Sequence, residues 1–351
     1  MNIVYVCSDL YSELAGISMV SLFENNRDAE EITVYIIDSG ISDENRSRLI
    51  EMAERYGRGL VFLSGKDVEG AAGTRIAVNG HSAVKNVNTY LRLFLASILP
   101  ETVDRVLYLD CDTIVTASLS ELWHTDMGQA WAMGADDCRG ELYRQEIGLP
   151  GDAIYTNNGV ILINLKAWRE EGVEEDFIRF IADHAGVITF DDQGVLNGVL
   201  GVRGRTGLLP PRWNVLSVYY FANLDEIEKY RHPVWAYTRE ELEDALRRPA
   251  IVHFTSFFIV GTRPWNAGDP HPMRQAFLYY KSLTPWRYAP DWPDNRTLKK
   301  KLSTKIYRAC PRPLLLSVFS VLHTGLYPRY RMAKSRKAQD RAFKKQEVHE
   351  K

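Results

Sequence analysis

Residues 105–115, Arg-Val-Leu-Tyr-Leu-Asp-Cys-Asp-Thr-Ile-Val, place two carboxylates at the end of an apolar run. Residues 106–109 are typical of a buried strand. Because an extended chain alternates its faces, Asp110 and Asp112 project to the same side. Two unpaired carboxylates repel each other and are costly to bury, so the pair predicts a bound cation. Carboxylate oxygens beside phosphate oxygens suit Mn²⁺ or Mg²⁺. The stretch therefore predicts a metal–diphosphate site at the carboxyl end of a strand in an α/β sheet.

The alternative is that Asp110-Cys111-Asp112 caps a turn and binds nothing, because isolated Asp-x-Asp sequences are common. The pair lies between two apolar stretches, at residues 106–109 and 113–115. Turn-capping aspartates seldom need such a buried platform, so the position favours the site.

Composition and charge indicate a soluble protein with a distinctive C-terminal end. The 351 residues, 45% apolar and 25% charged, suffice for one large α/β domain with an appendage or for two modest domains. Residues 296–351 contain 16 Lys and Arg against 3 Asp and Glu, a net charge of +13, whereas residues 1–295 carry about −15. A basic tail on an acidic body favours attachment to an anionic surface.

Targeting signals and cysteines point to the cytoplasm. Residues 1–6 lack a basic segment and an apolar stretch of signal-peptide length, and no run approaches the ~18–20 apolar residues that span a bilayer. The four cysteines (Cys7, Cys111, Cys138 and Cys310) have no metal-type spacing. We therefore expect free thiols in a reducing compartment.

Strand and helix patterns alternate along the first part of the chain. We expect strands at residues 2–6, 32–37, 59–63 and 159–164, and helices at 12–25, from Ser42, at 88–99, from Glu174 and from Asp191. This alternation predicts a doubly wound, mostly parallel α/β sheet with helices on both faces. No Gly-x-Gly-x-x-Gly loop follows the first strand and no Walker-type sequence is present, which argues against NAD, FAD and P-loop nucleotides. The polar, glycine-containing residues 64–88 are either a functional loop such as an active-site lid or a surface loop without a function.

Several motifs occur in an order that resembles one known family. They are residues 1–11, Tyr90-Leu91-Arg92, Asp110-Cys111-Asp112, Asn157-Asn158-Gly159, residues 162–168, residues 191–197, His253-Phe254 and Arg263-Pro264-Trp265. Together they resemble glycosyltransferase family 8, the retaining enzymes that include glycogenin and bacterial lipopolysaccharide galactosyl- and glucosyltransferases. The resemblance covers roughly residues 1–267. It implies a glycosyltransferase A-type catalytic domain at residues 1–270, followed by a basic helical region at 271–351.

The resemblance implies a metal site for a UDP-sugar donor. Asp110, Asp112 and His253 look like the three ligands of Mn²⁺ (or Mg²⁺), and mixed oxygen and nitrogen ligation favours Mn²⁺. The alternative for His253 is a core histidine that follows a strand. Arg263 stands where relatives usually carry a lysine on the β-phosphate, and arginine keeps that charge with a bidentate option. The preceding loop is longer here, at residues 255–260.

The resemblance also assigns residues to the nucleotide sugar. Donor contacts would come from Cys7, Ser8, Asp9, Tyr11, Arg92, Asp110, Cys111, Asn157, Asn158, Gly261 and Arg263. The Cys7-Ser8-Asp9 turn looks like the uridine-binding turn, although some relatives carry an acid in place of Ser8. The alternative for Arg92 is an ordinary cation on a helix surface.

Around the transferred sugar the resemblance places Asn157, Asp192 and Gln193. Asp192 would accept hydrogen bonds from sugar hydroxyls, and Gln193 would lie on the ring face opposite the leaving diphosphate. An alternative for Asp191 and Asp192 is helix capping. Asp136 and Asp137 either reach the sugar as well or form an exposed acidic turn. Because a carboxamide is a poor nucleophile, Gln193 favours front-face attack over double displacement.

The tail combines Lys299-Lys300-Lys301, an apolar run near residues 314–326, and further cations. This pattern favours peripheral binding to the anionic inner face of the cell membrane. The alternatives are a nucleic-acid-binding tail, for which no aromatic-interleaved module is visible, and a merely solvated terminus.

These features predict a hexosyltransferase that moves glucose or galactose from a UDP-sugar to an envelope glycan or lipid-linked acceptor. Two other functions stay open. A nucleotide-sugar pyrophosphorylase would need a glycine-rich basic loop, which residues 7–15 lack. A catalytically silent nucleotide-sugar binder or scaffold would bind UDP without turnover.

Overall fold

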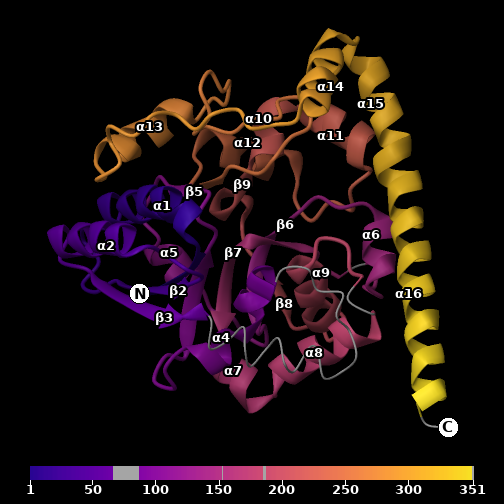
Figure 1. Ribbon diagram of the computed structural model, residues 1–351, viewed down its shortest axis with the longest axis horizontal. Coiled ribbons are helices and arrows are strands. Elements are labelled where there is room, and N and C mark those ends of the chain that lie inside the picture. The colour runs from indigo at the N-terminus through magenta and orange to yellow at the C-terminus, as the bar shows by residue number, and fades with distance from the viewer. Residues whose placement is uncertain (66–86, 152, 185–186, 350–351) are drawn as a thin grey trace.

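A mixed sheet forms the centre of the molecule (Figure 1). The computed structural model describes residues 1–65, 87–151, 153–184 and 187–349. Within them, seven strands are ordered β3-β2-β1-β4-β7-β6-β8. The strands are β1 (Asn2–Cys7), β2 (Thr33–Asp38), β3 (Gly59–Ser64), β4 (Arg105–Leu109), β6 (Ala132–Asp136), β7 (Thr156–Asn164) and β8 (Thr206–Leu208). Strands β3, β2, β1 and β4 are parallel, and β6 is parallel to β8, but β7 is antiparallel to both neighbours. The predicted mostly parallel sheet is confirmed.

A smaller sheet continues the chain beyond β4. It consists of β5 (Thr113–Val115), β10 (Ile251–His253) and β9 (Val215–Leu216), in that order. Strand β10 is antiparallel to β5, with His253 opposite Thr113. The pairing therefore brings the end of β10 beside the Asp-Cys-Asp segment that immediately precedes β5.

The first helices follow the predicted bounds closely. Helix α1 spans Ser12–Glu24 and α2 spans Asp43–Arg55. The hydroxyl of Ser42 accepts a hydrogen bond from the backbone N–H of Asn45, and acidic residues occupy the first turn of α2. The helix expected at 88–99 is instead a 3₁₀ segment, η2 (Val87–Phe94), followed by a single turn, α4 (Leu95–Ile98). Most of the 64–88 segment, residues 66–86, lies outside the described residues.

Helices cover both faces of the sheet, as the alternation predicts. The further helices before residue 298 are α5 (Ser120–Trp123), α6 (Glu141–Glu146), α7 (Leu165–Glu170), α8 (Val173–Asp183), α9 (Asp192–Leu196), α10 (Ser217–Phe221), α11 (Leu224–Arg231), α12 (Arg239–Arg247) and α13 (Arg274–Ser282), with short 3₁₀ or π segments η1 (Asp9–Tyr11), η3 (Asn197–Gly201) and η4 (Pro211–Trp213). One face buries α1 against residues such as Ile36 and Leu107. The other buries Trp168 and Phe177, whose rings meet edge to face at 5.2 Å.

The C-terminal region is helical, as predicted. It contains α14 (Leu298–Ala309), α15 (Arg312–Ser320), the π segment η5 (Val321–Leu326) and α16 (Tyr327–His349). Helix α16 runs along the right edge of the molecule in Figure 1. Arg331 donates to the backbone oxygen of Ile188 at 2.9 Å, and Gln339 to that of Asp183 at 2.7 Å, so α16 is fastened to the body. Among the described residues, no helix combines the length and apolarity needed to cross a bilayer. The domain boundary at residue 270 stays a prediction.

Candidate active site

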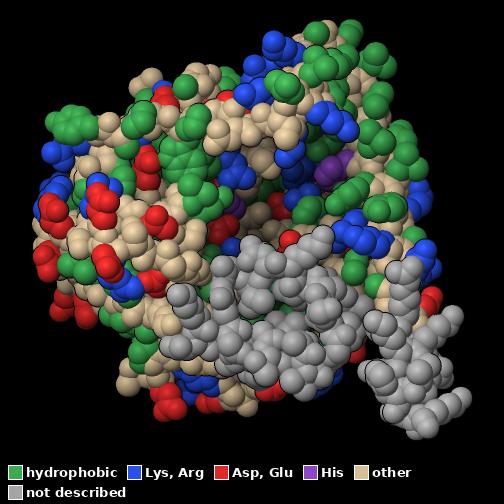
Figure 2. All heavy atoms as spheres, in the orientation of Figure 1, with side chains coloured by type: hydrophobic (Ala, Val, Ile, Leu, Met, Phe, Trp, Pro, Cys, Tyr) green, Lys and Arg blue, Asp and Glu red, His purple; other side chains and the backbone are tan. Residues whose placement is uncertain are grey.

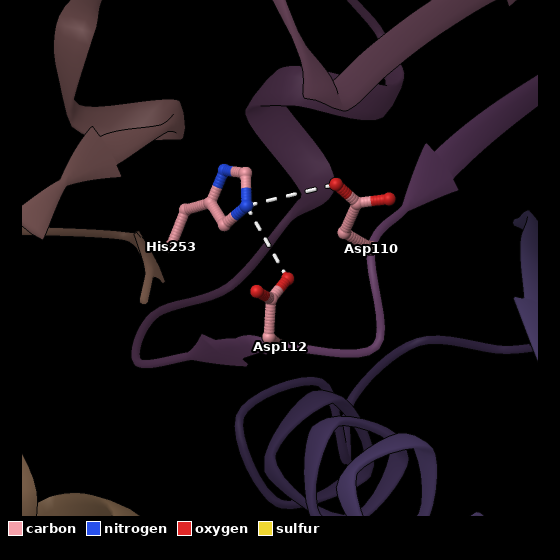
Figure 3. A group of neighbouring side chains, drawn as sticks. All are labelled: Asp110, Asp112 and His253. Atoms are coloured by element: carbon pink, nitrogen blue, oxygen red, sulfur yellow. Dashed lines mark ion pairs between the residues drawn. The ribbon is translucent and has the colours of Figure 1, made fainter. Parts of the chain in front are cut away.

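Asp110, Asp112 and His253 converge at the junction of the two sheets (Figure 3). The Nε2 atom of His253 lies 3.3 Å from Oδ1 of Asp112 and 3.6 Å from Oδ2 of Asp110. One ligand atom from each residue falls within 4.8 Å of the others. Two carboxylates and one imidazole around a single point form a donor set that suits Mn²⁺. The sequence prediction that these three residues share a site is therefore consistent with the geometry.

The imidazole of His253 is held in an orientation that suits a metal ligand. Its Nδ1 lies 3.2 Å from Oδ1 of Asn214, whose amide nitrogen donates to Oδ1 of Asn157 at 3.0 Å. With Asn214 in this orientation its oxygen accepts the Nδ1 proton, which leaves the Nε2 lone pair facing the carboxylates. The ring also lies on Gly159, where an added Cβ would come within 2.1 Å of Cε1. The residues therefore fit a divalent cation.

Without a cation, the histidine and the carboxylates stabilise each other's charges. Burial lowers the pKa of His253, but Asp112 and Asp110 together raise it by more, so the net direction is upward. Burial raises the pKa of Asp112, but His253 and Arg263 together lower it by more, so the net direction is downward. A bound cation would take the place of the histidine proton, so we expect proton release when metal binds.

Arg92 connects the metal ligands with the predicted sugar-binding residues. Its guanidinium pairs with Oδ1 of Asp110 at 3.0 Å and with Oδ2 of Asp192 at 3.1 Å. A third nitrogen donates to the backbone oxygen of Asn158 at 2.9 Å. The guanidinium carbon lies 4.5 Å from the centre of the Tyr108 ring. Arg92 is therefore a mostly buried residue that joins the metal ligands to the predicted sugar-binding residues, and it is not a surface cation.

Arg263 stands on the other side of the acidic pair. Its NH1 atom donates to Oδ2 of Asp112 at 2.9 Å, and its guanidinium lies over the ring of Trp265 at 5.3 Å. The side chain is about one-third exposed, so it can reach an anion bound beside the carboxylates. The role of Arg263 at a phosphate group stays a prediction.

A cavity of about 400 Å³ opens beside these residues. Its lining includes Val6, Ser8, Tyr11, Ser39, Thr89, Arg92, Tyr108, Asp110, Cys111, Asp112 and Arg263. This donor cavity contains Ser8 and Tyr11 of the predicted uridine turn. Cys7 is buried beneath it, and its thiol donates to the backbone oxygen of Ser8.

Two of the predicted donor contacts, Asp9 and Gly261, do not line this cavity, and their roles stay predictions. The carboxylate of Asp9 accepts 2.8 Å hydrogen bonds from the Ser42 backbone and the Asn45 side chain, so it caps the start of α2. Gly261 adopts a φ of +71° and lies against the guanidinium of Arg296, away from the donor cavity lining. Neither position follows from the motif order alone.

The predicted sugar-binding residues form one buried network. The side-chain nitrogen of Asn158 donates to Asp192 at 3.2 Å, and Nε2 of Gln193 donates to Asp137 at 2.7 Å. Asn157 lies 3.4 Å from both Asp137 and Gln193. Buried Asp137 belongs to this network, which contradicts the alternative of an exposed acidic turn.

The helix-capping alternative fails for Asp191. Its φ is +46°, and its side chain makes no capping hydrogen bond at the start of α9. Burial raises the pKa of Asp192 to about 6, and Arg92 opposes the shift. The carboxylate of Asp192 is therefore buried and faces Arg92, which suits the binding of hydroxyl groups better than the capping of a helix.

Three residues that contribute to the site were not predicted from the sequence. Asn214 orients His253, Tyr108 donates to Asp110 at 2.9 Å, and Arg139 pairs with Asp137 at 2.6 Å. Asn214 and Arg139 stand outside any recognisable motif. Tyr108 lies in the segment 105–115, where the alternation of an extended chain puts it on the same side as Asp110. Its contact with Asp110 could therefore have been predicted from the sequence.

Comparison with known proteins yields a consistent set of relatives. The sequence profile of glycosyl transferase family 8 matches residues 2–268. General stress protein A of Bacillus subtilis is 28% identical over 289 residues, which cover 82% of this chain and 94% of that protein. The lipopolysaccharide 1,3-galactosyltransferase of Salmonella typhimurium is 26% identical over 82% of this chain and 79% of its own length. The lipopolysaccharide 1,2-glucosyltransferase of Escherichia coli K12 is 24% identical over the same shares.

Solved structures share the fold. The galactosyltransferase LgtC, crystallised with donor and acceptor sugar analogues, superposes with a TM-score of 0.65 at 24% identity. The match covers 82% of this chain and 99% of that one. The apo glycosyltransferase GlyE of Streptococcus pneumoniae matches with a TM-score of 0.55 at 20% identity, over 91% of this chain and 62% of that one.

Proposed function

The chain belongs to glycosyl transferase family 8, and from that premise we propose that it moves glucose or galactose from a UDP-sugar to an envelope glycan or lipid-linked acceptor. The observation that carries the proposal is the convergence of Asp110, Asp112 and His253 beside the donor cavity, with Arg263 next to them. Two carboxylates and an imidazole suit the metal ion, and the partly exposed guanidinium of Arg263 suits the diphosphate.

The reaction breaks the bond between the anomeric carbon and the β-phosphate, so negative charge grows on the departing UDP. A Mn²⁺ ion held by Asp110, Asp112 and His253 would supply Lewis-acid stabilisation of that charge. Arg263 adds a fixed positive charge from the protein, and it needs no reorganisation because Asp112 and Trp265 already hold it.

We propose that the transfer retains the configuration of the sugar through front-face attack. Gln193 is fixed by its hydrogen bond to Asp137, and its carboxamide is a poor nucleophile. Asp192 is held by Arg92 and Asn158, which leaves it suited to accept hydroxyl hydrogen bonds. If a Gln193→Glu variant accumulated a covalent sugar adduct during normal turnover, double displacement would become the better account.

We further propose that the C-terminal helices attach the enzyme to the anionic inner face of the cell membrane. Exposed apolar side chains recur along them, at Leu298, Leu302, Ile306, Leu314, Val318, Val321, Leu322, Leu326, Tyr327 and Tyr330. Lys and Arg residues flank the apolar run, between residues 296 and 312 and from residue 329 onward, which is the composition of an interfacial anchor. Replacing Leu302 and Ile306 by Ser should reduce co-flotation with anionic vesicles, whereas Val61→Ser, an exposed apolar residue on β3, should not.

The donor site is tested by measuring UDP release from a panel of UDP-sugars with and without Mn²⁺. We expect Mn²⁺-dependent release from UDP-glucose or UDP-galactose, lost in Asp112→Asn and kept in Asp28→Asn, which removes an exposed carboxylate. Metal-independent release would refute the metal assignment. UDP binding without turnover, in the presence of candidate acceptors as well, would favour the silent nucleotide-sugar binder.

A further inference from the structure

A second cavity, of about 560 Å³, is lined by α14, by the inserted loop that follows His253, by the end of α11 and by Arg139, which precedes α6. Its lining includes Arg139, Arg231, Arg296 and Lys300. Figure 2 shows a hollow in the middle of this face of the molecule, with basic side chains above it and both basic and acidic side chains within and beside it. Of the residues assigned so far to the donor, the metal or the apolar membrane surface, only Gly261, a predicted donor contact, lines this cavity.

The charge of the second cavity is unbalanced. Its lining contains four cations and no carboxylate. Two carboxylates behind the lining compensate part of the charge, because Asp137 pairs with Arg139 and Asp294 pairs with Arg296. Lys300 has no ion pair among the described residues, and the Nε atom of buried Arg231 has no hydrogen-bond partner there. An excess of positive charge with an unused buried donor favours an anionic ligand.

A neighbouring histidine adds no further positive charge. Burial lowers the pKa of His323 to about 3, and Arg139 and Arg231 lower it in addition. The ring is therefore neutral at physiological pH. Its Nδ1 lies 3.4 Å from the hydroxyl of Tyr143, so it serves as part of the polar wall.

Aromatic rings make up much of the remaining lining. Phe190 lies under the guanidinium of Arg139 at 3.9 Å. Phe258 meets Tyr230 at 5.3 Å and Tyr307 at 5.7 Å, so three rings form one continuous surface. Rings beside cations suit a ligand that has both an apolar or sugar face and an anionic group.

The carboxylate of Asp137 connects this cavity with the donor site. Its Oδ2 atom accepts a hydrogen bond from Gln193 at 2.7 Å and pairs with Arg139 at 2.6 Å. Gln193 is the residue proposed to face the transferred sugar, and Arg139 lines the second cavity. The second cavity therefore begins one side chain away from Gln193, beside the proposed position of the transferred sugar.

Helix α14 faces the cavity and the solvent with different residues. Lys300, Ser303, Thr304 and Tyr307 line the cavity at helical spacing. Leu298, Leu302 and Ile306 lie on another side of the helix, 85%, 59% and 51% exposed. One short helix thus joins the proposed membrane face to the polar wall of the cavity.

From these contacts we infer that the second cavity is the acceptor subsite and that it takes an acceptor whose sugar is linked to a phosphate group. The inference rests on the proposed transferase function. Lys300 contacts the phosphate, and the buried charge of Arg231 attracts it, while the aromatic surface formed by Tyr230, Phe258 and Tyr307 holds the attached sugar or chain. Because α14 also carries the apolar face, a membrane-borne phosphate ester fits better than a free one.

The test is calorimetric titration of protein saturated with UDP and Mn²⁺, so that the donor site is already filled. The probes are hexyl phosphate, glucose 1-phosphate and, as the uncharged control, hexyl glucoside. We expect both phosphates to bind and hexyl phosphate to bind more tightly. Lys300→Gln should weaken phosphate binding about tenfold, the loss of one charge-assisted contact. Lys299→Gln, which removes the same charge one residue away, should change it less than twofold.

Each result bears on the inference separately from the proposed function. Binding of hexyl glucoside as tight as that of hexyl phosphate would overturn the phosphate assignment, as would equal effects of the two lysine variants. Tighter binding of glucose 1-phosphate would keep the phosphate subsite but point to a free acceptor. Failure of UDP and Mn²⁺ to bind in the preceding titration would instead refute the donor site. The fold of each variant is checked by its thermal unfolding.

Discussion

Replacing Gly159 by alanine should weaken Mn²⁺ binding strongly without unfolding the protein. The added Cβ would come within 2.1 Å of Cε1 and 2.4 Å of Nδ1 of His253, whereas carbon contacts in proteins lie near ~3.5 Å. The imidazole must therefore retreat by about 1 Å, several times the ~0.2 Å tolerance of a metal–ligand bond. The retreat would also break the hydrogen bond to Asn214.

We expect the affinity for Mn²⁺, titrated in the presence of UDP, to fall about 100-fold. A displacement of ~1 Å in a catalytic site can lower the reaction rate by a similar factor. Mn²⁺-dependent UDP release should fall with it. Gly151→Ala is a matched control, because the structure places nothing within 4 Å of a Cβ added there and its φ is not positive. The control should bind Mn²⁺ as the wild type does.

A double-mutant cycle shows whether the effect acts through His253. In a His253→Ala background the obstructing ring is gone, so Gly159→Ala should cost almost nothing further. A second, equal loss in that background would refute the reasoning, as would unchanged Mn²⁺ affinity in the single variant. Thermal unfolding of all variants separates a local displacement from general destabilisation.

Three further outcomes follow from buried and charged groups. Burial raises the pKa of Asp136 to about 7, so the folded state holds a proton that the unfolded chain releases near pH 4, and stability falls as pH rises through 7. Asp136→Asn should remove this fall, about 2–3 kcal/mol between pH 5 and 8 in urea unfolding; a pH-independent difference from wild type would contradict it. Arg263→Met should lower kcat for UDP release about 100-fold and Arg263→Lys about tenfold, and equal losses would exclude a role for the charge. Arg169 donates to five backbone carbonyls in residues 96–103, so Arg169→Ala should lower the free energy of unfolding by about 2–4 kcal/mol. Full stability in Arg169→Lys would show that the several donors of the planar guanidinium are not required.

Local sequence patterns predicted the parts of the site that depend on local structure. The apolar run before Asp110 forms β4, and the spacing of Asp110 and Asp112 places both carboxylates near His253. Ser42 caps α2 because a hydroxyl before an acidic turn satisfies the first free N–H groups. The strand before Asp110 and the cap of α2 involve residues that lie close together in the sequence, so residue type and spacing determine them. The approach of His253 to the two carboxylates depends in addition on the pairing of β5 with β10.

Side-chain partners from distant segments could not be predicted in this way. Asp9 belongs to a turn that resembles a uridine site, but its carboxylate faces Ser42 and Asn45, 33 and 36 residues along the chain. Asn214 reaches His253 only because β9 and β10 pair in parallel. Such contacts depend on how strands are ordered in space, and the periodicity of one sequence does not contain that order.

The direction of β7 explains why separate motifs form a single site. In a uniformly parallel sheet, the start of β7 would lie at the edge opposite to the end of β4, far from Asp110. Because β7 is antiparallel, Leu109 pairs with Val160, and the backbone N–H of Asp110 donates to the oxygen of Gly159 at 2.8 Å. The start of β7 therefore supplies the glycine under His253, and Asn157 and Asn158 beside it reach the sugar-binding residues. Metal ligation and sugar binding thus depend on one strand reversal, so a substitution that shifts the register of β7 should impair both together.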